Sequence, residues 1–385
     1  MSTLAALAGW TIATLCCAYA LAALTARARR YRPSDPAPPC VGVSVLKPLF
    51  GAEERLEENL AALCTQDHPQ FEILCGVRDP GDAAVPIVAR VRERFPQVAI
   101  SLVVDSRVYG TNLKVSNLIN IEQRARYQTV VLADSDIAVE SDYLRRVTAP
   151  LADPGVGIVT CLYRGRAVPS FWSRVGALFI DTWFAPSVRV ASALGSDAFA
   201  FGATIALRRQ TLRDGGGFEA VRNRLADDYW LGAIARRRGL ATVLSEVEVI
   251  TEVPETRVSQ LWLREVRWLR TIRALNPVGF AFLFITFTLP MAGLAIAFST
   301  STATVTLAAI AILARLALQV HRVGWRRLWL APVRDALLLL EWIAACGGDR
   351  VTWRDSTLGV DQRAPTVHDL PTPPAEASSA YRKQP

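Results

Sequence analysis

The chain has 385 residues, enough for one large globular domain together with membrane segments. Hydrophobic residues make up 51% of it, and the formal net charge is +8, from 43 Lys and Arg against 35 Asp and Glu. The basic residues are dispersed and form no nucleic-acid-binding motif, so we expect no nucleic acid as a partner. The charge favours anionic lipid headgroups and an anionic substrate instead.

Cysteine and histidine usage narrows the chemistry further. The seven cysteines form no C-x-x-C pair, and several lie in apolar runs, which is typical of a reducing compartment without a disulfide framework. There are only three histidines, so a histidine-based zinc site is not expected.

The N-terminal segment, residues 1–26, has no charged side chain and is long enough to cross a bilayer. Four arginines follow it within residues 27–32. A secretory signal places its basic residues before the apolar core, so the reverse order predicts an uncleaved transmembrane anchor whose C-terminal side faces the cytoplasm. Residues 27–40 then form a basic, proline-rich linker.

Residues 41–257 alternate apolar strands with helical stretches, the pattern of a largely parallel sheet covered by helices. We therefore expect an α/β domain of the Rossmann-related type, with a mixed, mostly parallel sheet and helices on both faces. The expected strands are residues 43–46, 73–77, 102–104, 130–133 and 158–160, and the expected helices include residues 53–63, 85–95 and 114–127.

The C-terminal third predicts a membrane collar. Residues 258–277 form an amphipathic interface helix, rich in basic and aromatic side chains. The apolar stretch that follows is too long for one crossing and contains a polar break at residues 299–302, so we expect two transmembrane helices within residues 278–322. Both would return the chain to the cytoplasm, which predicts a multi-pass protein of the inner membrane with a cytoplasmic catalytic domain.

A further apolar stretch, residues 328–346, contains Arg334, Asp335 and Glu341. These charges favour an interfacial or re-entrant helix over a third C-terminal crossing, which stays the alternative. Residues 347–385 form a cytoplasmic tail that we expect to be disordered after about residue 364.

The sequence Asp134-Ser135-Asp136 directly follows the apolar run 130–133. In open α/β sheets, ligands bind outside the carboxyl ends of such strands. Two carboxylates two residues apart can reach one hard cation, either Mg²⁺ or Mn²⁺, and that cation could neutralise a diphosphate leaving group. A lone D-x-D by itself is more often an acidic turn after a strand, and the other motifs decide between the two interpretations.

Three further features support a ligand site at the acidic pair, although each could also have a purely structural role. Asp79 closes the expected strand 73–77 and could be an ordinary turn residue. Asp227-Asp228-Tyr229 follows a glycine-rich turn and could serve only as a helix N-terminus. In residues 264–268 the sequence Arg-Glu-Val-Arg-Trp places two arginines and a tryptophan on one helical face, which could act only as a membrane anchor together with Trp262.

Taken in chain order, these motifs resemble the D, D, D, (Q/R)xxRW signature of processive and lipid-directed family-2-like glycosyltransferases. Further motifs resemble more closely the ceramide glucosyltransferase family, which is glycosyltransferase family 21 and has the GT-A fold, and within it the bacterial branch associated with hopanoid biosynthesis. The resemblance runs from residue 41 to about residue 354. Its motifs are residues 44–49, 112–118, 132–137, 160–165 and 226–229, with Trp353-Arg354 late in the chain.

The resemblance implies a reaction centre. Inversion at the anomeric carbon needs a base that takes the proton from the incoming hydroxyl, and a carboxylate suits that task. Asp228 matches the family's catalytic base, with Asp227 as the weaker candidate. Asp136, together with Asp134, would hold a divalent cation on the donor diphosphate.

The remaining site residues match positions that bind the donor. Lys47 and Asp79 match positions near the uracil and ribose. Lys114 would contact the donor phosphates, or else be a solvated lysine at a helix start. Arg264 and Arg267 suit the departing diphosphate. Trp268 can cover the sugar or the acceptor.

These roles predict a membrane enzyme that moves one sugar from a UDP-sugar to a lipid hydroxyl. The resemblance implies N-acetylglucosamine from UDP-GlcNAc onto a polyhydroxylated hopanoid of the bacteriohopanetetrol type, with glucosylation of ceramide from UDP-glucose as the alternative. A non-catalytic membrane protein that binds nucleotide sugar or lipid is the alternative of another class, and the intact acidic motifs argue against it. With only two C-terminal crossings expected, a polysaccharide synthase with a channel is not favoured. The oligomeric state is left open.

Overall fold

The computed structural model describes residues 3–28, 42–348, 350–353 and 356–359. They fall into two compact units, which we call the sheet unit and the membrane unit. Most of the linker expected at residues 27–40, and the whole tail expected to be disordered, lie outside the described residues. Of the described residues, the sheet unit comprises 42–162 and 197–249, and the membrane unit comprises 3–28, 163–196, 250–348, 350–353 and 356–359.

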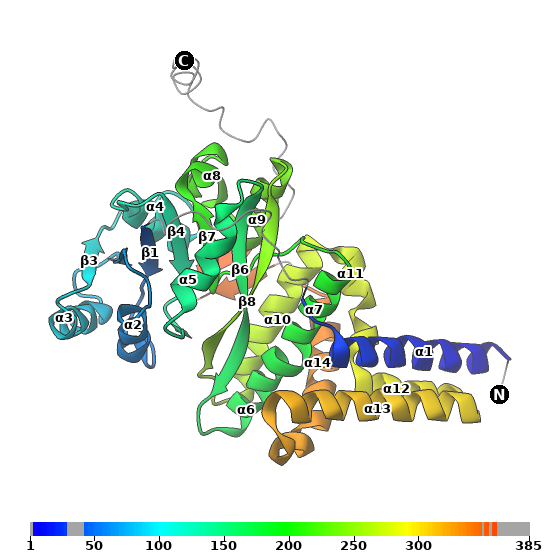
Figure 1. Ribbon diagram of the computed structural model, residues 1–385. Helices are drawn as coiled ribbons and strands as arrows, with labels where there is room; N and C mark the ends of the chain where they lie inside the picture. The colour runs from blue at the N-terminus through cyan, green and yellow to red at the C-terminus, as the bar shows by residue number, and fades with distance from the viewer. Residues whose placement is uncertain (1–2, 29–41, 349, 354–355, 360–385) are drawn as a thin grey trace. The chain divides into compact units, whose positions relative to one another are not determined.

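An eight-stranded mixed sheet has the strand order β3-β2-β1-β4-β7-β6-β8-β5 (Figure 1). Strand β1 pairs in parallel with β2 and with β4, and β2 pairs in parallel with β3. Strand β7 pairs antiparallel with β4 and with β6. The expected α/β fold with a mixed sheet is therefore confirmed. The strands are β1 (Val43–Pro48), β2 (Phe71–Val77), β3 (Ala99–Val104), β4 (Thr129–Ala133), β5 (Ile137–Ala138), β6 (Val156–Ala167), β7 (Thr204–Arg208) and β8 (Ala241–Val253).

Each of the five expected strands is present, but the sequence analysis did not predict β5, β7 or β8. Strand β7 is short and pairs with β4 and β6, which lie far away along the chain. No turn or repeat next to it in the sequence therefore predicts it. In strand β8, apolar and polar residues alternate: Val247 and Val249 are buried, while Glu246 is exposed. The sequence analysis could have predicted this strand from that alternation.

Helix α4 packs against the centre of the sheet and is fixed there by two asparagines. Asn112 caps its N-terminus, accepting a hydrogen bond from the backbone N–H of Val115. Asn117 donates through Nδ2 to the carbonyl of Gly76 at 2.8 Å, so the helix lies very close to β2. The helical segments of this unit are α2 (Leu56–Cys64), α3 (Ala84–Arg94), α4 (Leu113–Glu122), α5 (Tyr143–Thr148), η1 (Ala149–Ala152), α8 (Arg209–Asp214), η3 (Phe218–Val221) and α9 (Asp227–Arg237).

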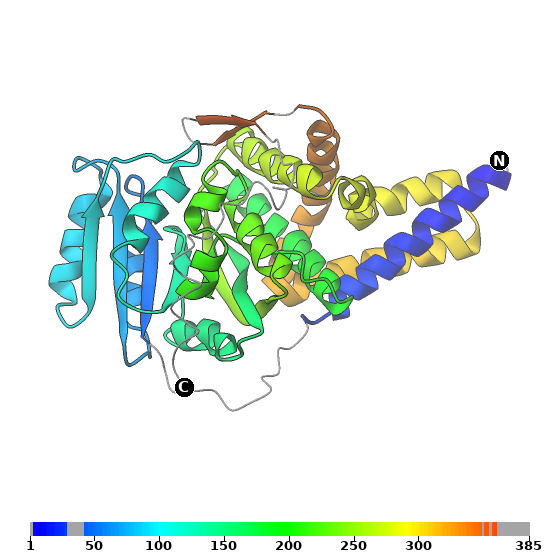
Figure 2. The same ribbon diagram turned by 90° about the horizontal axis from the view of Figure 1, so that it is seen from above.

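In the membrane unit, α1 (Thr3–Thr25) and α13 (Thr302–Val323) are long and apolar enough to cross a membrane. They pack side by side with α12 (Thr288–Phe298), as Figure 2 shows. The other segments are α6 (Phe171–Phe179), the π-helical turn η2 (Ile180–Phe184), α7 (Ala185–Ala193), α10 (Val258–Leu275), α11 (Pro277–Ala281), η4 (Phe282–Thr286), η5 (Trp325–Leu330), α14 (Ala331–Ala345), β9 (Arg350–Trp353) and β10 (Ser356–Gly359).

The structure shows the shape of the apolar stretch within residues 278–322. The first of the two transmembrane helices expected within residues 278–322 is not continuous, because Pro277–Thr286 and Thr288–Phe298 meet at a bend of 75°. Pro290 lies in the first turn of α12. Its ring would clash with the carbonyl of Thr286 if the helix continued upstream, so the chain breaks at Phe287. This segment is a broken span or a re-entrant loop, and α13 is the continuous one.

The tight contact between β2 and α4 gives a stability prediction. A Cβ atom at Gly76 would lie 2.1 Å from Asn117 Oδ1 and 2.4 Å from Ile121 Cγ2. We expect Gly76→Ala to destabilise the chain by about 1–3 kcal/mol, because the helix must move off the sheet. Thermal unfolding of the purified chain measures the effect. Gly81→Ala is the control, since its nearest neighbour would lie at an ordinary 3.4 Å. Equal unfolding temperatures for the two variants would contradict the prediction.

Candidate active site

Lys47 contacts the turn that contains Asp134 and Asp136. It lies in β1, which pairs with β4, and its fully buried ammonium group donates a hydrogen bond to the backbone carbonyl of Asp134. Burial lowers the pKa of Lys47 to about 8, and the charges of Asp136 and Asp134 partly offset that effect. The side chain therefore holds the turn in which the two acidic residues lie.

Lys114, at the start of α4, reaches across to the same turn. Its Nζ lies 2.6 Å from Asp134 Oδ1 and 4.0 Å from Asp227 Oδ2, and the side chain is only 16% exposed. Burial alone would lower the pKa of Lys114, but the facing carboxylates, Asp134 first, outweigh it and raise that pKa. Lys114 is thus largely shielded from solvent and faces the carboxylates of Asp134 and Asp227.

The two acidic residues that begin α9 have different partners. Asp228 Oδ2 accepts a hydrogen bond from the backbone N–H of Gly202 at 2.8 Å, and its Oδ1 accepts one from the N–H of Tyr229 at 2.7 Å. Asp227 is buried, and its Oδ1 lies 3.3 Å from Asn112 Nδ2, which donates to it. Asp227 therefore ties α9 to α4, while Asp228 remains partly exposed.

Gly202 is the point at which these groups converge. A Cβ atom at this position would lie 3.3 Å from Asp228 Oδ2, 3.3 Å from Lys114 Nζ and 3.6 Å from Asp134 Oδ2. The carboxylates of Asp228 and Asp134 and the ammonium group of Lys114 therefore all lie close to Gly202. The sequence analysis did not single out Gly202, because a lone glycine after an aromatic segment carries no motif.

The environment of Asp228 suits a general base. Burial, followed by the neighbouring charge of Asp227, raises the pKa of Asp228 to about 7, although Lys114 and two backbone N–H groups act in the opposite direction. A carboxyl group that titrates near neutral pH can both accept and release a proton under ordinary conditions.

Asp134 and Asp136 fit a divalent cation bound together with a diphosphate. The Asp134 side chain is 30% exposed and Asp136 is also partly exposed, so oxygens of both can be reached. Within the described ranges, no group of three or more His, Cys, Asp or Glu side chains could hold a metal ion. Mg²⁺ and Mn²⁺ need no such cage, since they commonly bind one or two carboxylates plus substrate phosphates and water. Such a cation would neutralise charge on the diphosphate.

Asp79 lies in an exposed turn after β2, where its Oδ1 accepts a hydrogen bond from the N–H of Gly81 at 2.8 Å. This is the turn geometry that its sequence Asp-Pro-Gly-Asp indicates. A role near the uracil or ribose stays a prediction.

The remaining candidates lie on α10 in the membrane unit. Arg264 is engaged by two carboxylates, with Nη1 2.6 Å from Glu255 Oε2 and Nη2 3.4 Å from Glu265 Oε1. Arg267 is partly exposed. Both arginines remain candidates for contacting an anionic ligand.

Trp268, on the same helix, packs within an aromatic cluster. Its ring lies 5.5 Å from that of Phe184, 5.7 Å from that of Phe179 and 6.3 Å from that of Tyr163, measured between ring centroids. These contacts fix the plane of the indole and leave it half-buried.

The mixed sheet, with an acidic pair after β4 and a partly exposed carboxylate at the start of α9, defines a glycosyltransferase of the GT-A type. The sequence profile of glycosyl transferase family 21 matches residues 8–364, and the chain belongs to that family. The family predicted from the sequence motifs is therefore confirmed.

Curated relatives agree with this assignment. Ceramide glucosyltransferase 1 of Caenorhabditis elegans is 25% identical over 250 residues, which cover 65% of this chain and 53% of the relative. Ceramide glucosyltransferase 3 of the same organism is 25% identical over 242 residues, which cover 61% of this chain and 51% of the relative. The chain thus spans about half the length of these relatives.

Among solved structures, the mannosyltransferase PcManGT from Pyrobaculum calidifontis, in complex with GDP-Man and Mn²⁺, is similar to this chain. The TM-score is 0.56 at 20% sequence identity, and the match covers 88% of this chain and 96% of the mannosyltransferase. At this level of identity the likeness shows a shared fold.

The geometry around Asp228 generates a direct test. Asp228→Asn keeps the shape of the side chain but removes the base, and general-base catalysis typically contributes about 10²- to 10⁴-fold. We expect a loss of turnover of that order, with nucleotide-sugar affinity kept within a few fold, as measured by release of the nucleoside diphosphate and by calorimetric binding. A variant that turns over at the wild-type rate would contradict the assignment.

Proposed function

We propose that this protein transfers a single sugar from a UDP-sugar to a lipid hydroxyl at the membrane and inverts the anomeric centre. The preferred pair is N-acetylglucosamine from UDP-GlcNAc and a polyhydroxylated hopanoid of the bacteriohopanetetrol type. The observation that carries the proposal is the convergence of Asp228, Lys114 and Asp134 around Gly202. A partly exposed carboxylate with a raised pKa, close to Lys114 and Asp134, fits a general base better than a residue that only binds nucleotide sugar.

The transfer step follows from these positions. The acceptor oxygen attacks the anomeric carbon and gives its proton to Asp228, while the bond from that carbon to the UDP oxygen breaks. Lys114 provides positive charge near the departing diphosphate. A cation held by Asp134 and Asp136 would supply further neutralisation when bound.

In the proposed reaction, Arg267 and Trp268 act from α10. Arginine presents a planar fork that suits phosphate oxygens, and the half-buried indole offers an apolar wall to a sugar or lipid. The protein would lie in the inner membrane through α1, α13 and the bent α11–α12 segment, with the sheet unit in the cytoplasm.

Glucosylation of ceramide from UDP-glucose is the second candidate. The names of the curated relatives favour it, since both are ceramide glucosyltransferases. The donor-binding motifs would serve either reaction, because they address the diphosphate that both donors share.

The reaction itself can be tested with membranes that contain the protein, labelled UDP-GlcNAc or UDP-glucose, and either a hopanoid polyol or ceramide. We expect a labelled glycolipid from UDP-GlcNAc and the hopanoid. Because the donor diphosphate needs a cation, EDTA should abolish the product, and Mn²⁺ or Mg²⁺ should restore it. Product formed from UDP-glucose and ceramide would favour the second candidate. Activity indifferent to EDTA would mean that Asp134 and Asp136 have another role.

Arg267 distinguishes a catalytic role of α10 from membrane anchoring alone. Lysine keeps the charge but lacks the planar fork, so Arg267→Lys should bind donor and remain in the membrane while turning over at least about tenfold more slowly. Such a loss corresponds to about 1.4 kcal/mol in the barrier. The control is Arg270→Lys on the same helix, whose Nε donates to the carbonyl of Gly347. Full activity of the Arg267 variant would favour anchoring.

A further inference from the structure

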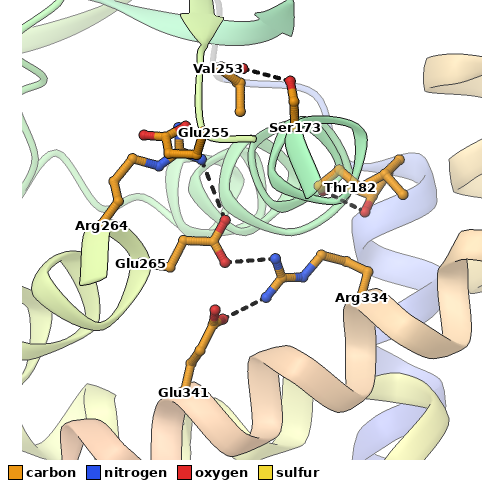
Figure 3. Close-up of polar contacts among 9 residues, drawn as sticks. Ser173, Thr182, Val253, Glu255, Arg264, Glu265, Arg334 and Glu341 are labelled. Atoms are coloured by element: carbon orange, nitrogen blue, oxygen red, sulfur yellow. Dashed lines mark hydrogen bonds and ion pairs between the residues drawn. The ribbon is translucent and has the colours of Figure 1, made fainter. Parts of the chain in front are cut away.

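A chain of buried charges links α10 to α14 within the membrane unit (Figure 3). Arg334 of α14 places Nη1 2.6 Å from Glu265 Oε2 and Nη2 2.5 Å from Glu341 Oε2. All three side chains are fully buried, with 0% exposure. Glu265 belongs to α10, and it lies between Arg264 and Arg267 in the sequence of the candidate site.

The network continues from Glu265 toward the start of the helix. The second oxygen of Glu265 lies 3.4 Å from Arg264 Nη2, and Arg264 in turn pairs with Glu255 at 2.6 Å. The guanidinium of Arg334 also lies over the ring of Phe179, 5.4 Å from its centroid. Glu265 is therefore held from two sides, and its orientation is fixed by both arginines.

A fully buried ion pair is a poor source of stability, because the cost of removing both charges from water offsets much of their attraction. Apolar side chains of the same size would hold two helices together as well or better. An ion pair also restricts how the helix is rotated about its axis, because its hydrogen bonds keep good geometry at only one rotation. In α10 that rotation also sets where the side chains two and three residues later point.

We propose that Arg334 is a positioning residue for the transfer reaction, fixing the rotation of α10 through Glu265 so that Arg267 and Trp268 keep one orientation. This inference rests on the proposed function for its effect on catalysis. The fixing of α10 itself can be measured without any sugar.

Glu341 has a different part in the network. Burial raises the pKa of Glu341 to about 9, while the charge of Arg334 opposes the rise and that of Glu265 adds to it. Glu341 lies on α14 together with Arg334, so their contact does not join α14 to α10, whereas the contact of Arg334 with Glu265 does. An amide at position 341 should therefore leave α10 in place, while an amide at position 265 should not.

The experiment compares Glu265→Gln, Arg334→Gln and Glu341→Gln in the full-length chain in lipid nanodiscs. Asp335→Asn is the matched control, because Asp335 also lies on α14 but pairs with Arg315 of α13, at 2.7 Å, in a second buried ion pair. Three quantities are measured for each variant: UDP affinity in the presence of Mn²⁺, kcat with the UDP-sugar that the wild type uses, and amide hydrogen exchange across residues 258–275.

We expect Glu265→Gln and Arg334→Gln to lower kcat at least about tenfold and to speed exchange in α10, with UDP affinity within about threefold of wild type. Glu341→Gln and Asp335→Asn should keep kcat within about twofold and leave exchange in α10 unchanged. If Asp335→Asn lowers kcat as much as Glu265→Gln does, any buried ion pair would have the same effect and the proposal is overturned.

A double variant covers the case in which the single variants do not fold. Glu265→Met with Arg334→Met replaces the pair by apolar side chains of similar length, which buried sites often tolerate. We expect it to fold and to remain slow, and full wild-type kcat would overturn the proposal. If the wild type turns over no UDP-sugar, the proposed function fails, while hydrogen exchange still decides the positioning role. Unchanged exchange in Glu265→Gln would overturn that role by itself.

Discussion

The ion pair between Lys114 and Asp134, whose Nζ and Oδ1 atoms lie 2.6 Å apart, holds together the acidic edge of the sheet unit. The turn after β4 brings Asp134 and Asp136 to this edge, and the N-terminus of α9 brings Asp227 and Asp228. Carboxylates this close repel one another strongly when water is excluded. Lys47 and Lys114 balance part of that charge from the neighbouring elements β1 and α4. The excess of negative charge that remains suits a site completed by a divalent cation.

The membrane unit meets a related constraint by a different route. Ionisable side chains are costly where lipid or protein excludes water, so they are buried as pairs. Arg315 with Asp335, and Arg334 with Glu265 and Glu341, are such groups, and both include a residue of α14. Helix α14 is therefore joined to α13 and α10 by buried ion pairs. These pairs account for the charged residues in a stretch whose other residues are mostly apolar.

Local pattern was enough to predict much of the fold. The parallel strands β1 to β4 and the helices between them follow from apolar runs and helical periodicity, and the D-x-D and R-x-x-R-W motifs indicated the family. The antiparallel insertion of β7 did not follow, because its pairing depends on strands distant in the chain. The bend at Phe287 could have been anticipated from Pro290.

The sequence by itself determined which residue types are available for chemistry and on which elements they lie, since both properties are encoded within short windows. Only the tertiary structure decided their partners. It showed that Lys114 is enclosed by carboxylates, that Gly202 marks the point where they meet, and that Arg264 is engaged by Glu255 and Glu265. Such contacts depend on distances between segments far apart in the chain, and the charge of a side chain does not reveal which opposite charge will face it.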